Sequence, residues 1–85
     1  MFLHVGNNKN IRIKQVVGIF DMDNTTVSSI TRKFLNNKQK KGLVESADSE
    51  IPKSFILYRD GQDMKVCFSQ ISASALRGRL NNNLE

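Results

Sequence analysis

Residues 54–69, SFILYRDGQDMKVCFS, give the strongest indication of the fold expected for this chain. The run 54–59 is apolar on both faces of an extended strand, which is typical of a strand in the middle of a sheet. Asp60-Gly61 predicts a tight turn. Residues 64–69 then return with apolar side chains at alternate positions, as a strand that packs on one face requires. The segment therefore predicts an antiparallel hairpin whose first strand is central.

Two further strands are expected upstream of this hairpin. Residues 2–6 form the first strand, and residues 7–10 form a polar turn of a kind that tolerates left-handed backbone. Residues 11–20, IRIKQVVGIF, are rich in β-branched and aromatic side chains and are expected to be extended throughout. Gly18 is a candidate β-bulge within this second strand.

A helix from about residue 26 to residue 41 is the clearest element of the sequence. Residues 21–26 offer several N-caps, and Gly42 is a good terminator. At the helical spacing of about 100° per residue, apolar side chains recur along one stripe. The stripe that is expected to face inward consists of Val27, Ile30, Thr31 and Phe34, with Leu35 at its margin. Phe34 is therefore expected to pack in the core.

Residues 43–52 are expected to form a mixed acidic loop. A last short helix, capped by Ser72 and with Arg77 and Arg79 projecting outward, completes the order β-β-α-β-β-α. This order predicts a small α+β single domain with a largely antiparallel sheet. The domain is expected to span residues 1–83, and Leu84-Glu85 is interpreted as a cloning remnant. A domain of 85 residues buries only about 60–65% of its unfolded surface, so self-association is a natural way to bury more.

Composition is typical of an aqueous globular domain, with 39% hydrophobic and 25% charged residues. One cysteine, Cys67, cannot form an internal disulfide, and with His4 as the single histidine no zinc site is expected. No apolar run approaches the ~20 residues of a membrane span. The sequence thus predicts a cytoplasmic protein with no metal and no cofactor.

Positive charge is segregated along the chain, whose net charge is +5. Acidic residues are absent from residues 1–20, 24–44 and 64–84, a distribution that favours polyanionic partners. The outer side of the expected helix gathers most of the candidate cations, although such a face can also serve solubility alone. The candidate nucleic-acid-binding residues are Arg32, Lys33, Lys38, Lys40, Lys41 and Lys53.

One stretch resembles a catalytic motif. Residues 19–27, IFDMDNTTV, are similar to the first motif of haloacid-dehalogenase-type phosphatases, which would make Asp21 the nucleophile, Asp23 the acid/base and Thr25 a supporting hydroxyl. That chemistry also needs a later acidic pair, yet only Glu85 follows Asp63. The stretch is better explained as a strand end followed by helix caps, so no catalytic residue is expected and a phosphatase is a distant third reading.

Four segments together resemble the Rem-type extracellular matrix regulatory proteins, which are small cytoplasmic proteins of Gram-positive bacteria. The similarity spans residues 2–80 in order and with matching spacing, and the chain is more similar to RemB than to RemA. The four segments are FLHVG (2–6), VGIFD (17–21), PKSFI (52–56) and SQISASAL (69–76).

The resemblance implies a DNA-binding transcriptional regulator of biofilm and extracellular matrix genes that acts as a homo-oligomer, in the RemA branch a ring. Its implied partner is double-stranded DNA, with no membrane and no small-molecule substrate. The arginines that contact DNA in the family lie just before the strand that begins near Lys53, so only Lys53 is carried over. Glu50 would repel phosphate there. An oligomeric protein-binding adaptor without direct DNA contact therefore stays open as the alternative.

Overall fold

Two sheets and two α-helices make up the described parts of the computed structural model, which are residues 1–6, 9–22, 29–47 and 51–84. The N-terminal hairpin pairs β1 (Phe2–Gly6) with β2 (Lys9–Arg12). The main sheet has the order β3 (Val16–Asp21), β5 (Ser54–Asp60), β6 (Asp63–Ser69) and β4 (Val44–Ser46). The helices are the 3-10 turn η1 (Ile13–Gln15), α2 (Ser29–Lys40) and α3 (Ala73–Leu84).

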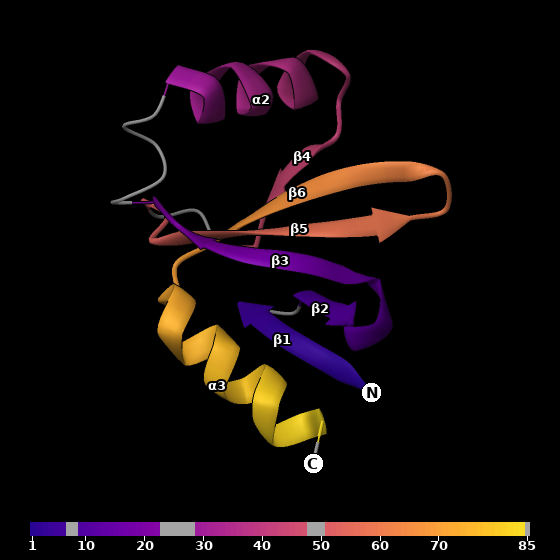
Figure 1. Cartoon of the computed structure of the whole chain (residues 1–85), viewed down its shortest axis with the longest axis vertical. Coiled ribbons are helices and arrows are strands. Elements are labelled where there is room, and N and C mark those ends of the chain that lie inside the picture. Colours follow the sequence, from indigo (N-terminus) through magenta and orange to yellow (C-terminus); the bar gives the residue numbers. More distant parts are fainter. Residues whose placement is uncertain (7–8, 23–28, 48–50, 85) are drawn as a thin grey trace.

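The main sheet separates two layers (Figure 1). Helix α2 lies on one side of it, and the N-terminal hairpin and α3 lie on the other. Strand β5 is central and pairs antiparallel with both β3 and β6, while the short β4 runs parallel to β6. The predicted α+β class, the largely antiparallel sheet and the central position of residues 54–59 are therefore confirmed.

The single strand predicted over residues 11–20 is wrong. Strand β2 ends at Arg12, η1 turns the chain, and β3 begins at Val16 in the other sheet. The predicted turn at 7–10 is wrong for Lys9 and Asn10, which belong to β2, whereas residues 7–8 lie outside the described part. Both errors arise because β propensity does not show which sheet a segment joins.

Strand β4 lies inside a segment, residues 43–52, that the sequence predicted as a loop. Its backbone pairs with β6 through Val44 opposite Val66 and Ser46 opposite Phe68. This short strand forms because the edge of β6 lies close to the end of α2 and offers free backbone groups. The Val66 amide extends the pairing by donating to the Leu43 carbonyl at 2.9 Å.

The bulge predicted at Gly18 is confirmed. Val16 pairs with Tyr58 and Gly18 with Leu57, so Val17 is an extra residue in β3. Val17 is 57% exposed as a result. A Cβ atom at Gly18 would lie 2.8 Å from the ring of Phe20, which explains why glycine stands there.

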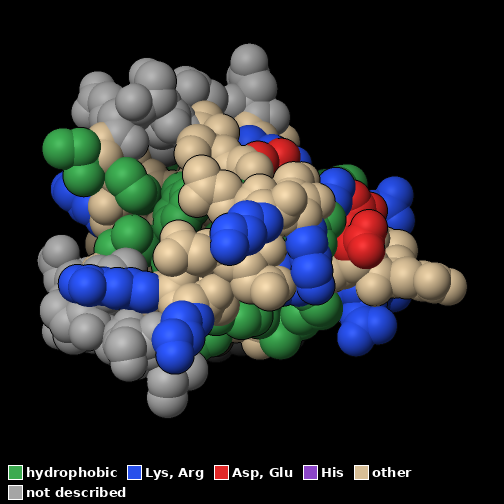
Figure 2. All heavy atoms as spheres, turned by 90° about the horizontal axis from the view of Figure 1, so that it is seen from above, with side chains coloured by type: hydrophobic (Ala, Val, Ile, Leu, Met, Phe, Trp, Pro, Cys, Tyr) green, Lys and Arg blue, Asp and Glu red, His purple; other side chains and the backbone are tan. Residues whose placement is uncertain are grey.

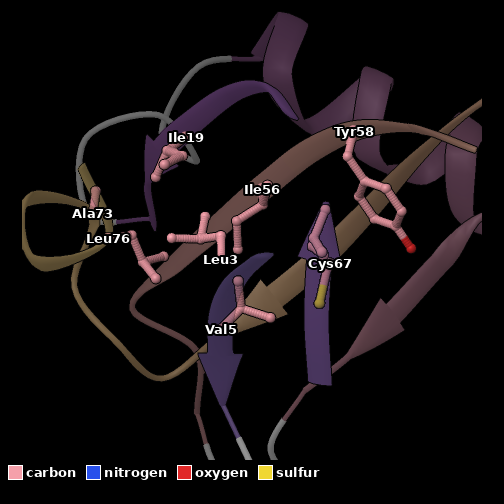
Figure 3. Close-up of a cluster of buried hydrophobic side chains, with 9 residues drawn as sticks. Leu3, Val5, Ile19, Ile56, Tyr58, Cys67, Ala73 and Leu76 are labelled. Atoms are coloured by element: carbon pink, nitrogen blue, oxygen red, sulfur yellow. The ribbon is translucent and has the colours of Figure 1, made fainter. Parts of the chain in front are cut away.

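The principal core fills the space between the main sheet, the N-terminal hairpin and α3 (Figure 3). Buried serines connect these layers: Ser54 Oγ donates to the Ile71 carbonyl at 2.7 Å and Ser69 Oγ to the Val5 carbonyl at 2.5 Å. Ser72 caps α3 as predicted, through Oγ and the Ala75 amide at 3.2 Å. The buried hydrophobic side chains of this core are Leu3, Val5, Ile11, Ile19, Ile56, Tyr58, Cys67, Ala73 and Leu76.

Aromatic side chains cross the opposite face of the main sheet. Phe20 stacks on Phe55 with ring centres 5.0 Å apart, and Phe68 meets Phe55 edge-on at 6.2 Å. These three residues are paired across β3, β5 and β6. Aromatic pairs across neighbouring strands stabilise a sheet, and this face is the side on which α2 lies.

The inward face of α2 differs from the predicted stripe. Thr31, Leu35 and Lys38 are half-buried, whereas Phe34 is 37% exposed and outside the core. The expectation that Phe34 packs in the core is therefore wrong. The helix is turned so that Leu35, about 100° around the axis from Phe34, takes the inward position. Val27 and the side chain of Ile30 lie outside the described part.

Candidate nucleic-acid interface

Three of the candidate cations lie together on the outward face of α2, defined here as Arg32, Lys33 and Lys40. All three side chains are exposed. Lys33 and Lys40 are two helical turns apart, so they lie almost above one another along the axis, separated by about 10 Å. Arg32 flanks them, and the exposed Asn36 lies between the two turns. Seen from the α2 side, Lys and Arg side chains are spread across this surface of the molecule (Figure 2).

Lys38 and Lys41 are placed differently from the outward face. Lys38 is half-buried, with Nζ 5.7 Å from the centre of the Phe34 ring. This cation–π contact is of the kind that shields an exposed aromatic ring. Lys41 is exposed in the turn after α2, where Gly42 adopts a φ of +71° and ends the helix. The structure thus spreads the predicted cluster over two sides of the helix and its end.

Lys53 lies at one end of the main sheet, just before β5. Its amide donates to the Ser69 carbonyl at 2.8 Å, and its carbonyl accepts from the Met22 amide at 3.0 Å. The side chain is exposed, and so is that of Ile51, two residues earlier in the sequence, at 87%. These two hydrogen bonds hold the backbone of Lys53 between Ser69, the last residue of β6, and Met22, the residue that follows β3. Glu50 lies outside the described residues.

Two carboxylates are neutralised by lysines of the strands. Glu45 Oε1 lies 2.8 Å from Lys9 Nζ and also accepts a hydrogen bond from the Tyr58 hydroxyl. Partial burial alone would raise the pKa of Glu45, but these two hydrogen bonds, together with the positive charges of Lys9 and Lys65, outweigh it and lower that pKa. Burial and the nearby Glu45 carboxylate raise the pKa of Tyr58.

The second neutralised carboxylate belongs to the β5–β6 hairpin. Asp60 Oδ2 lies 2.8 Å from Lys65 Nζ. This hydrogen bond lowers the pKa of Asp60 and raises that of Lys65. Both ion pairs are formed by strand residues, and the cations on the outward face of α2 take no part in them. The pairs therefore reduce the repulsion that these two carboxylates would exert on a polyanion.

Two arginines expected to project from the last helix instead bind backbone. Arg77 Nη2 donates to the Ile19 carbonyl at 2.7 Å, and Arg79 Nη1 donates to the His4 carbonyl at 3.1 Å. They hold α3 against β3 and β1. Sequence periodicity could place them on an exposed face but could not identify these acceptors.

The residues of the phosphatase-like motif are only partly described. Asp21 ends β3, and Asp23 and Thr25 lie outside the described residues. Within the described ranges no group of three His, Cys, Asp or Glu side chains could hold a metal ion. His4 is exposed, with Nδ1 3.2 Å from Asn10 Oδ1.

None of the helices in the described part of the chain has the length and apolar character that crossing a membrane requires.

Comparison with known families gives one match over nearly the whole chain. The model of a family described as RemA-like, extracellular matrix regulatory protein A-like, matches residues 2–80. The match runs from β1 into α3 and includes α2 and Lys53. No curated protein matches the chain.

Proposed function

The chain belongs to the RemA-like family of extracellular matrix regulatory proteins, and on this premise we propose that it regulates matrix genes by binding double-stranded DNA. In this proposal it acts in the cytoplasm as a homo-oligomer. The observation that carries the proposal is the outward face of α2, where Arg32, Lys33 and Lys40 are exposed on one element. Within the family we propose a place nearer to RemB than to RemA, because only Lys53 is basic at the site where the resemblance implies consecutive arginines in the RemA branch.

Binding would depend mainly on phosphates. Clustered cations neutralise phosphates and release condensed counterions, so affinity falls steeply with salt. The exposed amide of Asn36, between Lys33 and Lys40, can add a hydrogen bond to a phosphate or a base edge. Side chains of this kind position a protein on the duplex and contribute little sequence selectivity by themselves.

Self-association would multiply these weak contacts. Several copies of the outward face on one particle raise the effective concentration of each further contact. A thin core favours association, and several large apolar side chains are left at the surface where a second copy could cover them. These exposed side chains include Val17 and Ile51.

A second candidate function is an oligomeric adaptor that binds a protein partner and leaves DNA to that partner. Glu50, three residues before Lys53 in the sequence, favours it because a carboxylate repels phosphate. A gel shift with a duplex of about 40 base pairs at two salt concentrations separates the two functions. DNA binding predicts a shift at low salt that weakens as salt rises. If no shift occurs even at low salt, direct DNA binding is excluded and the adaptor is favoured.

A further inference from the structure

An open hollow of about 260 Å³ lies at the end of the N-terminal hairpin, and Met1, Phe2, Arg12 and Lys14 line it. The lining combines two apolar and two cationic side chains. Met1 and Phe2 are 80% and 56% exposed. This end of β1 lies on the side of the main sheet away from α2 (Figure 1), so the hollow is separate from the outward face of α2.

The hairpin fixes this arrangement through its pairing. Phe2 is opposite Arg12, while their neighbours Leu3 and Ile11 are also paired and are buried in the core. Because side chains alternate along a strand, Phe2 and Arg12 must lie together on the outer face. The Ile13 amide donates to the Met1 carbonyl at 3.1 Å, which holds the two chain segments together beyond the last pair.

The chemistry of the hollow suits an anion that carries a flat apolar group. The guanidinium carbon of Arg12 lies 5.9 Å from the centre of the Phe2 ring. Such an aromatic–guanidinium pair can stack on a nucleobase, and cationic side chains beside it can bind a phosphate. Arg12 and Lys14 supply these cations, and no acidic side chain lines the hollow among the described residues.

We propose that this hollow binds a phosphorylated nucleoside, with the base stacked on Phe2 and Arg12 and the phosphate bound by Arg12 and Lys14. The volume is just below the usual range of small-molecule pockets, about 300–1,000 Å³, and suits a single nucleotide rather than a larger cofactor. The same chemistry is available from a free mononucleotide and from an unpaired nucleotide of a strand. This site goes beyond the proposed binding of duplex DNA, which uses another face.

Titration of the isotope-labelled full chain with adenosine monophosphate, followed by NMR of the amides, tests the proposal. The amides of residues 2–3 and 12–15 should shift. Affinity should be at least about fivefold above that for adenosine or inorganic phosphate alone, because each supplies only half of the contacts. Phe2→Ala and Lys14→Gln should each weaken binding about five- to tenfold. The matched control Arg59→Gln removes an exposed cation of β5 and should have no effect.

A tetranucleotide of deoxyadenosine distinguishes the two sources. Tighter binding than the mononucleotide supports an unpaired strand, and equal or weaker binding supports a free nucleotide. Three results would overturn the proposal: no shift with about 10 mM mononucleotide, shifts confined to α2, or equal affinity for phosphate alone. A change in oligomer mass on Phe2→Ala with unchanged nucleotide affinity would instead make the hollow a self-association surface. Lys14→Gln should leave duplex binding unchanged, so failure of this site and failure of the DNA-binding proposal are distinguishable.

Discussion

Lys9 Nζ lies 2.8 Å from Glu45 Oε1, and this contact joins the N-terminal hairpin to the far edge of the main sheet. The Tyr58 hydroxyl donates to the same carboxylate oxygen, so β2, β4 and β5 meet at one charged group. Nothing in the spacing of these residues indicates the contact. It depends on β4, the strand that lies inside the predicted loop.

Removal of the Glu45 charge should therefore loosen the hairpin modestly. Glu45→Gln should lower the free energy of unfolding by about 0.5–1 kcal/mol, because a partly exposed ion pair contributes little. Denaturant unfolding of the variant and the wild type measures the difference. A loss above about 3 kcal/mol would show that Glu45 is far more deeply buried than the structure indicates.

The same Glu45 carboxyl group should also make the stability of the folded chain depend on pH. The pKa of Glu45 is lower in the folded chain than in the unfolded one, so its contribution is present above the ordinary glutamate range, about 4.3, and is lost as pH falls below it. Between about pH 6 and pH 3 the Tm of the wild type should fall more than the Tm of Glu45→Gln. Parallel curves for the two proteins would contradict the assigned direction.

Phe34 provides a test of the orientation of α2. Since the side chain is 37% exposed and outside the core, Phe34→Ala should cost only about 1 kcal/mol, far below the ~3–5 kcal/mol of a buried phenylalanine. Leu76→Ala serves as the control, because Leu76 is fully buried, and should cost about 2–5 kcal/mol. Equal losses in the two variants would mean that the helix presents Phe34 to the core after all.

Two glycines should respond in opposite directions to alanine. Gly18→Ala should destabilise the chain by about 1–2 kcal/mol, because the new Cβ meets the Phe20 ring, which is held by stacking on Phe55. Gly78→Ala should stabilise by about 0.5–1 kcal/mol, because the position is helical and nothing lies within 4 Å of the new atom. Thermal unfolding of both variants checks the pair; stabilisation by Gly18→Ala would contradict the bulge geometry.

Local sequence patterns were enough to predict the features that depend only on neighbouring residues. Four features each depend on the chemistry of a few neighbouring residues: the turn at Asp60-Gly61, the cap at Ser72, the bulge at Gly18 and the end of the helix at Gly42. The central position of residues 54–59 was also predictable, since only a strand covered on both faces can be apolar throughout.

Features that depend on tertiary partners were not predictable from those patterns. Strand β4 forms only because β6 lies beside it, and the turn at 13–15 exists because the chain changes sheets. The sequence indicated that Arg77 and Arg79 project from the last helix, but it did not show that they donate to backbone carbonyls of β3 and β1. Of the candidate interface, the sequence indicated the cations of α2 and that most of them lie on its outer side, but it did not indicate that Lys38 lies over the Phe34 ring.

The outward face of α2 makes a direct prediction for DNA binding. Arg32→Glu combined with Lys40→Glu should weaken duplex binding at least about tenfold at low salt and reduce the slope of log affinity against log salt by about 2. The matched control Arg12→Glu with Lys14→Glu makes the same change in net charge on the other side of the main sheet and should bind nearly as the wild type. Circular dichroism should show both double variants folded. Equal weakening by the two would mean that net charge, not the α2 face, determines binding.

Light scattering behind size exclusion shows whether this chain binds DNA as an oligomer. The chain is measured alone and with a duplex of about 40 base pairs at low salt. We expect a homo-oligomer that co-elutes with the duplex and separates from it as salt rises. A monomer whose elution the duplex does not change would contradict both self-association and DNA binding.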